Sequence, residues 1–187
     1  NHNFQKVFVE GEIGYIEGVV FENWGIGDFD ETLPLQCFGQ DYGFSNDPST
    51  LVRVGIDNKA KILYLHEGFV LKGLGTGKIQ ELNATIAGKQ TIVGDRAELR
   101  LIKELRATGL NMVECVKGKG SVAASLKLMQ DYRIIVTKDS VNLQKELRNY
   151  VWLANDIPID DYNHCIDAAR YAFDFLTTKN TGQYNIA

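Results

Sequence analysis

The first half of the chain alternates apolar and polar residues in three runs, which are separated by short segments rich in turn-forming residues. Because successive side chains of a β-strand point to opposite faces, such alternation predicts strands. We expect them at Leu35–Asp41, Leu51–Asp57 and Lys61–Val70. The links between these runs are short enough for hairpins, so the three strands are expected to form an antiparallel meander.

The second half changes to a repeating alternation of helical stretches and short β-like runs. The pattern predicts helices at Ile79–Ile86, Ala97–Ala107, Val122–Met129 and Val141–Leu147, and β-like runs at Thr91–Gly94, Asn111–Cys115 and Tyr132–Val136. Alternation of this kind builds parallel strands joined by right-handed crossovers. The predicted fold class is therefore α/β: a mixed sheet in which a three-strand antiparallel meander joins parallel strands, with helices on both faces.

Other segments lie at the two ends of this pattern. The turn-rich stretch Trp24–Asp30 has no sustained periodicity, and we expect it to be a connection leading into the domain. Asn149–Pro158 is expected to add a small hairpin before a final helix, which opens with a polar cluster that contains Asp160 and Asp161. In that position the two acids most simply cap the helix.

Length and composition indicate a single compact unit. With 187 residues, 44% of them hydrophobic, the chain can bury one substantial core but not two. It starts with Asn1 rather than Met, so we expect an excised or processed piece of a longer protein. No apolar run reaches the length of a membrane span, and we expect no membrane partner. Cys37, Cys115 and Cys165 form no C-x-x-C pair, which argues against a disulfide framework or zinc knuckle and favours a reducing, intracellular setting.

The net charge of −4 is unusual for a protein that binds nucleic acid through electrostatic attraction. DNA contact would therefore depend on local lysines. Lys117 and Lys119 lie in a loop before a predicted helix, where they and the helix amides could hold a backbone phosphate. Lys72 and Lys78 flank a glycine-rich loop that has Ile79 where a phosphate loop needs Ser or Thr. We expect this second segment to be a flexible loop near the active-site edge. All four lysines are candidate phosphate contacts, and for Lys117 and Lys119 the alternative is a solvated basic loop.

Two acidic residues follow predicted strands that we expect to be neighbours. Asp41 closes the first strand, and Asp95 comes directly after the run Thr91–Gly94. Each has a simpler structural alternative: an Asx-turn for Asp41, and a helix cap for Asp95, because Glu98 completes an Asp-x-x-Glu capping arrangement. Mixed α/β sheets, however, place their sites at the carboxyl ends of strands. Both acids are therefore candidate site residues.

A third acid, Asp167, interrupts the small apolar face of the final helix. Helical spacing places it on one stripe with His164 and Tyr171. Three converging carboxylates would repel one another unless divalent cations neutralise them, and such a site suits Mg²⁺ or Mn²⁺ in phosphodiester hydrolysis. His164 could ligate a metal, carry a proton or make only a local hydrogen bond.

Several of these residues stand in motifs that resemble the carboxy-terminal nuclease domain of the large terminase subunit, with which tailed bacteriophages cut and package concatemeric DNA. The motifs are Phe38-Gly39-Gln40-Asp41-Tyr42-Gly43 followed by Asp47-Pro48-Ser49, the strand-end Asp95, and Asn163-His164-x-x-Asp167-Ala168-x-Arg170-Tyr171-Ala172. The resemblance runs from about Leu35 to Phe175. The last motif is its most specific part, since Asp-x-Gly at a strand end is common to all ribonuclease H-like proteins.

The resemblance implies a ribonuclease H-like fold and an endonuclease that cleaves double-stranded DNA by two-metal hydrolysis. It implies that Asp41, Asp95 and Asp167 bind two divalent cations, Mg²⁺ or Mn²⁺, and that His164 assists them. It further implies that residues 34–187 are the nuclease domain and residues 1–33 a linker from an ATPase motor domain outside this sequence. The implied partners are DNA, the portal and the small terminase subunit, in the cytoplasm of the infected host cell.

Three other interpretations compete with this one. A ribonuclease H-like recombination nuclease, such as a resolvase or transposase, is disfavoured by the Asn-His-x-x-Asp-Ala-x-Arg-Tyr ending. An actin-like or sugar-kinase ATPase needs a second lobe, for which the chain is too short, and a second phosphate-binding Asp-x-Gly, which the chain lacks. A non-catalytic DNA-binding or scaffold module would use the same acids only as caps and turns.

Overall fold

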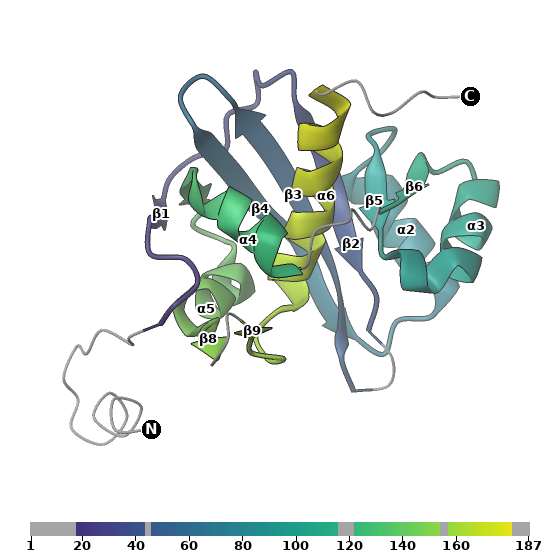
Figure 1. Ribbon diagram of the computed structural model, residues 1–187. Helices are drawn as coiled ribbons and strands as arrows, with labels where there is room; N and C mark the ends of the chain where they lie inside the picture. Colours follow the sequence, from purple (N-terminus) through teal and green to yellow (C-terminus); the bar gives the residue numbers. More distant parts are fainter. Residues whose placement is uncertain (1–17, 44–45, 116–121, 154–156, 181–187) are drawn as a thin grey trace.

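The computed structural model describes residues 18–43, 46–115, 122–153 and 157–180 (Figure 1). Its main feature is a seven-stranded sheet with the order β1-β7-β4-β3-β2-β5-β6, beside a small hairpin of β8 and β9. The strands are β1 Trp24–Ile26, β2 Gln36–Asp41, β3 Pro48–Asp57, β4 Ile62–Lys72, β5 Ile92–Gly94, β6 Met112–Glu114, β7 Arg133–Val136, β8 Trp152–Leu153 and β9 Ile157–Pro158. The helices are α2 Thr76–Ile86, the 3₁₀ turn η1 Arg96–Glu98, α3 Leu99–Ala107, α4 Val122–Gln130, α5 Val141–Asn149 and α6 His164–Asn180.

The sheet combines the predicted meander with parallel strands. β2, β3 and β4 pair antiparallel in sequence order, which confirms the meander. The parallel strands divide between its two sides: β5 and β6 extend the sheet from β2, whereas β7 and β1 extend it from β4. As a result β3 alone opposes the common direction of this sheet, and the other strands all end at one edge. We call this edge the carboxyl edge.

The prediction that Trp24–Asp30 is only a connection is wrong. Its first three residues form β1, which pairs parallel with β7. Val20 and Phe21, just before it, are almost fully buried in the core. The stretch was missed because three residues, one of them glycine, are too short to produce a periodic signal. Residues 1–17 of the predicted linker lie outside the described residues.

Helices cover both faces of the sheet, as expected (Figure 1). α4, α5 and α6 pack on one face through a core that includes Val52 and Val54 of β3, while α2 and α3 pack on the other through a core that includes Phe38. Neighbouring residues of β2 contribute to different cores, Cys37 to the first and Phe38 to the second. This is the alternation expected of a strand buried on both faces. No helix in the described ranges is long and apolar enough to cross a membrane.

Helix α6 lies unusually close to β2. Its inward side consists of Ala168, Ala169 and Ala172, all fully buried. Opposite them is Gly39 of β2, where an added Cβ would be 1.7 Å from the carbonyl oxygen of Ala168. Glycine is therefore required here by the approach of another backbone. The contact places the first turns of α6 over the carboxyl edge, next to Asp41.

Candidate active site at the carboxyl edge

Asp41 and Asp95 occupy equivalent positions on neighbouring strands. In the parallel pairing of β2 with β5, Gln40 is in register with Gly94, so the next residue of each chain segment is one of the two acids. The amide of Asp95 donates a hydrogen bond to the carbonyl of Gln40 at 3.3 Å, which extends the pairing by one step. The two acids predicted to be neighbours at strand ends are thus brought together at the carboxyl edge.

The first turn of α6 supplies His164, which lies directly against Asp41. The distance from Nδ1 of His164 to Oδ2 of Asp41 is 3.2 Å. The hydrogen bond to Asp41 raises the pKa of His164, burial opposes this shift, and the charges of Asp41 and Glu146 add to it. The imidazole is therefore held toward its protonated form by the acid that it contacts. The contact joins residues 123 positions apart, so it is not a local hydrogen bond of the helix start.

Asp167 lies one helical turn further along α6. Burial raises the pKa of its carboxyl group, Arg170 opposes this shift, and the negative charges of Asp41 and Asp95 add to it. Nε and Nη2 of Arg170 donate to Oδ1 of Asp167 at 3.1 and 2.9 Å. The charges of both strand-end acids therefore act on Asp167, which lies at the same edge of the sheet.

Each carboxylate of this site already has a protein donor. Besides the bonds to His164 and Arg170, the amide of Ala97 donates to Oδ1 of Asp95 at 3.0 Å. The capping alternative for Asp95 is therefore realised at the start of η1, alongside its position in the site. Within the described ranges, no three His, Cys, Asp or Glu side chains lie close enough together to hold a metal ion as they stand. A cation bound here would share each carboxylate with its protein donor.

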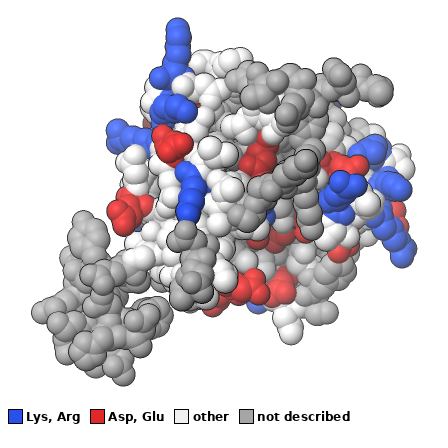
Figure 2. Space-filling model, viewed as in Figure 1, with Lys and Arg blue, Asp and Glu red and all other residues white. Residues whose placement is uncertain are grey.

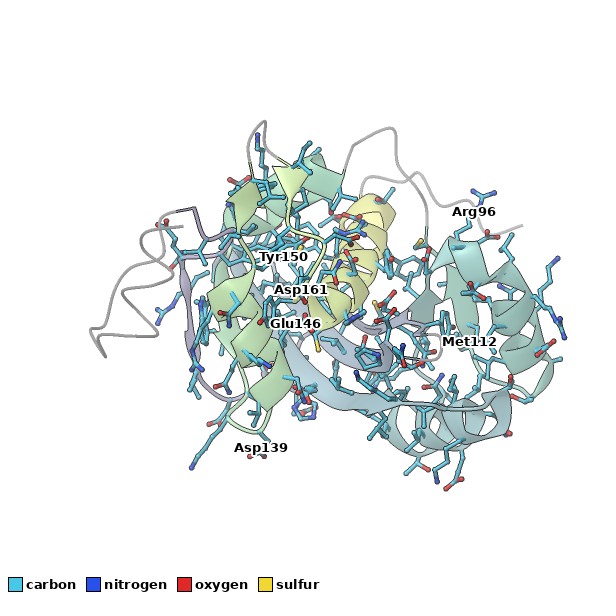
Figure 3. All side chains as sticks on the ribbon, turned by 90° about the horizontal axis from the view of Figure 1, so that it is seen from below. Arg96, Met112, Asp139, Glu146, Tyr150 and Asp161 are labelled. Atoms are coloured by element: carbon cyan, nitrogen blue, oxygen red, sulfur yellow. The ribbon has the colours of Figure 1, made fainter. Side chains whose placement is uncertain are left out.

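The predicted caps of the final helix are wrong. Oδ1 of Asp161 accepts from the amide of Tyr162, and Oδ1 of Asp160 lies 3.4 Å from Nδ2 of Asn163. Instead, Glu146 of α5 reaches the helix from outside, and its Oε2 accepts from the amide of Ile166 at 3.0 Å. Figure 3 shows Glu146 beside α6, on the side of α5.

Glu146 and a small polar network around Arg170 were not found by sequence reasoning. Glu146 lies between the buried Leu143 and Leu147 on the inward face of α5, and an acid on such a face was the signal that could have revealed it. Nη1 of Arg170 is 4.0 Å from Oδ2 of Asp174, whose Oδ1 accepts from Ser125 of α4 at 2.5 Å. Ser125 has no sequence signal, because the contact is purely tertiary.

Neither of the two candidate lysines in the described part of the chain contacts the carboxylates. Lys72 is exposed at the end of β4, and Lys78 forms an exposed ion pair with Glu81 at 2.9 Å, on the face covered by α2 and α3. Lys117 and Lys119 lie outside the described residues. Figure 2 shows acidic side chains along the middle and lower part of the face covered by α6, with Lys and Arg mainly toward its sides.

A cavity opens beside Asp167. It has a volume of about 740 Å³ and lies between the start of α4, β9 and the start of α6. Its walls are mostly apolar, with Val122, Ile157 and Pro158 among the lining residues, and Asp160 and Asp167 supply negative charge. Of the three site acids, Asp167 is the one that this cavity reaches.

A mixed sheet of this order, with acids at its carboxyl edge, defines the ribonuclease H-like class of folds. The family model described as "Terminase RNAseH like domain" matches residues 41–175, and the chain belongs to this family. The PBSX phage terminase large subunit of Bacillus subtilis (strain 168) is 28% identical over 149 residues, which cover 75% of this chain and 34% of that protein. The chain thus spans about a third of the length of this relative.

Two solved structures have the same fold. The nuclease domain of g2p, the large terminase of bacteriophage SPP1, solved with bound Mn, superposes with a TM-score of 0.74 and 24% identity, covering 83% of this chain and 97% of that one. The P22 large terminase nuclease domain superposes with a TM-score of 0.69 and 16% identity, covering 87% of this chain and 93% of that one. The predicted ribonuclease H-like fold is confirmed.

Proposed function

We propose that this chain is the nuclease domain of a large terminase, and that it cleaves double-stranded DNA with two divalent cations held by Asp41, Asp95 and Asp167. The observation that carries this proposal is the meeting of three acids, from β2, from the end of β5 and from α6, at one edge of the sheet. Burial is the main cause of the raised pKa of Asp167, and repulsion by the negative charges of Asp41 and Asp95 adds to it. Bound cations would remove this repulsion.

The donor set suits Mg²⁺ or Mn²⁺. Carboxylate oxygens are hard ligands, and Mg²⁺ binds them at about 2.0–2.1 Å. Neighbouring strands lie about 4.8 Å apart, so one ion can reach both Asp41 and Asp95. In each of the three carboxylates only one oxygen has a hydrogen-bond partner among the described residues: Oδ2 of Asp41, Oδ1 of Asp95 and Oδ1 of Asp167. The second oxygen of each is available for a ligand.

The residues have separable roles in this proposal. When bound, the two cations would lower the pKa of the attacking water and stabilise the leaving oxygen. Asp41, Asp95 and Asp167 hold them, and Arg170 orients the carboxylate of Asp167. His164 orients Asp41 and holds a proton near the site through Nδ1.

The proposed substrate and partners rest on the similarity of this chain to large terminases. We propose concatemeric viral DNA as the substrate, cut during genome packaging in the cytoplasm of the infected host cell. In the full-length protein we expect an ATPase motor domain, with the portal and the small terminase subunit as partners. Lys117, Lys119, Lys72 and Lys78 are proposed contacts to the DNA backbone. Because the net charge is −4, we expect the domain alone to bind DNA weakly and in a salt-sensitive way.

A plasmid cleavage assay with matched variants tests this function. Supercoiled plasmid is incubated with the protein in Mn²⁺, in Mg²⁺ or in chelator, alongside Asp41→Asn, Asp95→Asn and Asp167→Asn. The control is Asp57→Asn, since Asp57 ends β3 at the opposite edge of the sheet, where its carboxylate caps a turn. We expect metal-dependent cutting by the parent and by the control, and none by the three site variants.

Three results would contradict the proposal in different ways. Cutting in chelator would exclude metal dependence, and site variants that cut like the parent would exclude these three acids. A parent that neither cuts plasmid nor binds Mn²⁺ in a calorimetric titration would favour the non-catalytic scaffold. Selective cutting of branched DNA over linear duplex would favour a recombination nuclease.

A further inference from the structure

We propose that Thr50 and Glu146 are positioning residues, which fix the first turn of α6 from two sides and thereby set His164 and Asp167 against Asp41. The inference rests on the proposed function, because it assigns these two residues to the same site. Among the described residues, neither side chain hydrogen-bonds to the carboxylate of Asp41, Asp95 or Asp167. Both act through the backbone of α6.

Thr50 holds the turn from the sheet. It lies directly opposite Asp41 in the antiparallel pairing of β2 with β3, so both side chains project from the same face. Thr50 is fully buried, and its Oγ1 donates a hydrogen bond to the carbonyl of His164 at 3.1 Å. The residue that faces Asp41 across the sheet thus binds the backbone of the histidine that contacts Asp41. This contact fixes the distance between α6 and the strand end.

Glu146 holds the same turn from α5. It is only 7% exposed, and its carboxylate accepts from the amides of Cys165 and Ile166, which lie between His164 and Asp167. Burial raises the pKa of Glu146, and these two hydrogen bonds oppose that shift. A buried acid is costly unless it has partners, and the amides at a helix N-terminus are favourable partners for an anion. Its position is therefore explained by the turn that it holds.

The two acids that precede the first turn do not replace these contacts. Among the described residues, the carboxylates of Asp160 and Asp161 bond elsewhere. Further along α6, the close approach of Gly39 to Ala168 prevents the helix from tilting toward the sheet. Loss of either outside contact would leave His164 and Asp167 on a loosened turn, while the rest of α6 stays packed. The expected consequence is weaker metal binding without global unfolding.

Isosteric variants test this inference. Thr50→Val removes the hydroxyl and Thr50→Ser retains it, while Glu146→Leu removes the acceptor and Glu146→Gln retains it. The matched control is Glu67→Leu, because Glu67 holds α5 in the same way, with Oε2 accepting from the amides of Asn142 and Leu143 at 2.9 and 3.1 Å. The Mn²⁺ dissociation constant is measured by calorimetry, and hydrogen exchange is followed at the α6 amides, on the whole 187-residue chain.

We expect Thr50→Val and Glu146→Leu to weaken Mn²⁺ binding by about 10- to 100-fold, the range for residues that orient metal ligands. Exchange of the Cys165 and Ile166 amides is expected to accelerate in both. Thr50→Ser and Glu146→Gln are expected to restore most of the affinity. Glu67→Leu is expected to lower the melting temperature and leave the Mn²⁺ affinity unchanged.

The two readouts separate this inference from the proposed function. If the parent does not bind Mn²⁺, the proposed function fails, and unchanged exchange in Thr50→Val and Glu146→Leu would then overturn the positioning role as well. If the parent binds Mn²⁺, three results overturn the inference: variants that bind as tightly as the parent, a loss of equal size in Glu67→Leu, or no recovery in Thr50→Ser and Glu146→Gln.

Discussion

Gly39 of β2 lies directly against the carbonyl group of Ala168 in α6, with room for a hydrogen atom but not for a methyl group. A Cβ on Gly39 would be 1.7 Å from that oxygen, and 3.2 Å from Cβ of Ala172. The obstacle is backbone, which cannot rotate away as a side chain would. Gly39 therefore permits the close approach of helix and sheet, and it stands two positions before Asp41.

Gly39→Ala is accordingly expected to displace α6. We expect a loss of stability at the upper end of the range of about 1–3 kcal/mol for overpacked cores, and a loss of metal-dependent cleavage. The control is Gly77→Ala in α2, where an added Cβ meets nothing within 4 Å. This substitution is expected to stabilise the protein by about 0.5–1 kcal/mol. Urea unfolding of both variants measures the difference, and equal stabilities would contradict the close approach.

A buried amide pair supports β2 from the other face. Nε2 of Gln40 donates to Oδ1 of Asn83 at 3.0 Å, Nδ2 of Asn83 donates back to Oε1 of Gln40 at 2.8 Å, and both residues are fully buried. Asn83→Leu is expected to cost about 1–3 kcal/mol, because it leaves the amide of Gln40 without a partner. The double variant Gln40→Leu/Asn83→Leu is expected to cost less than the sum of the two single variants. A double-mutant cycle in urea measures the coupling, and additive costs would count against a shared network.

Glu146 predicts a pH dependence of stability. Burial raises its pKa above the ordinary value of 4.5 in the folded state. As the pH rises from about 4.5 through the folded pKa, the unfolded chain releases this proton first, so the free energy of unfolding falls and then stays lower. Glu146→Gln removes the titration and retains an acceptor. We expect the melting temperature of Glu146→Gln to rise relative to that of the parent across this interval. A difference between the two melting temperatures that stays constant from pH 4 to pH 8 would refute the assignment.

Metal binding is expected to stabilise the fold. A ligand that binds only the folded state adds about 2.7 kcal/mol when present at 100 times its dissociation constant. Mn²⁺ is therefore expected to raise the melting temperature of the parent. Asp167→Asn is expected to abolish most of this increase, whereas Asp57→Asn at the opposite edge keeps it. A thermal scan with and without Mn²⁺ tests this, and an identical increase in both variants would place the ion elsewhere.

Local patterns predicted most of the elements and the three acids. The meander β2–β4 was found because alternation and turn residues are encoded in adjacent positions. Asp167 was predicted because an acid is unexpected on a helix face of small apolar residues that packs inward. Asp95 was predicted from its place after a strand. Its local sequence fits a helix cap equally well, and its carboxylate does cap the start of η1.

The strand order and the long-range contacts could not be predicted from the sequence. Nothing in the order of elements revealed that β5 and β6 join one side of the meander and β7 the other. Glu146 caps a helix that begins 18 positions later in the chain, and Thr50 binds the backbone of His164 across 114 positions. Such contacts depend on how the helices and strands pack together, which local periodicity does not encode. The resemblance of the motifs predicted the site residues, but not Thr50 and Glu146, which contact the first turn of α6.

The short strand β1 has a consequence for how this domain can be isolated. It pairs with β7 and lies before residues 41–175, to which the family model corresponds. A fragment trimmed to those residues would lose residues 36–40 of β2 from within the sheet and Val20 and Phe21 from the core, and it would leave β7 as a bare edge. Uncovered edge strands present unpaired amide and carbonyl groups that recruit other chains. The segment around β1 therefore protects the domain from aggregation.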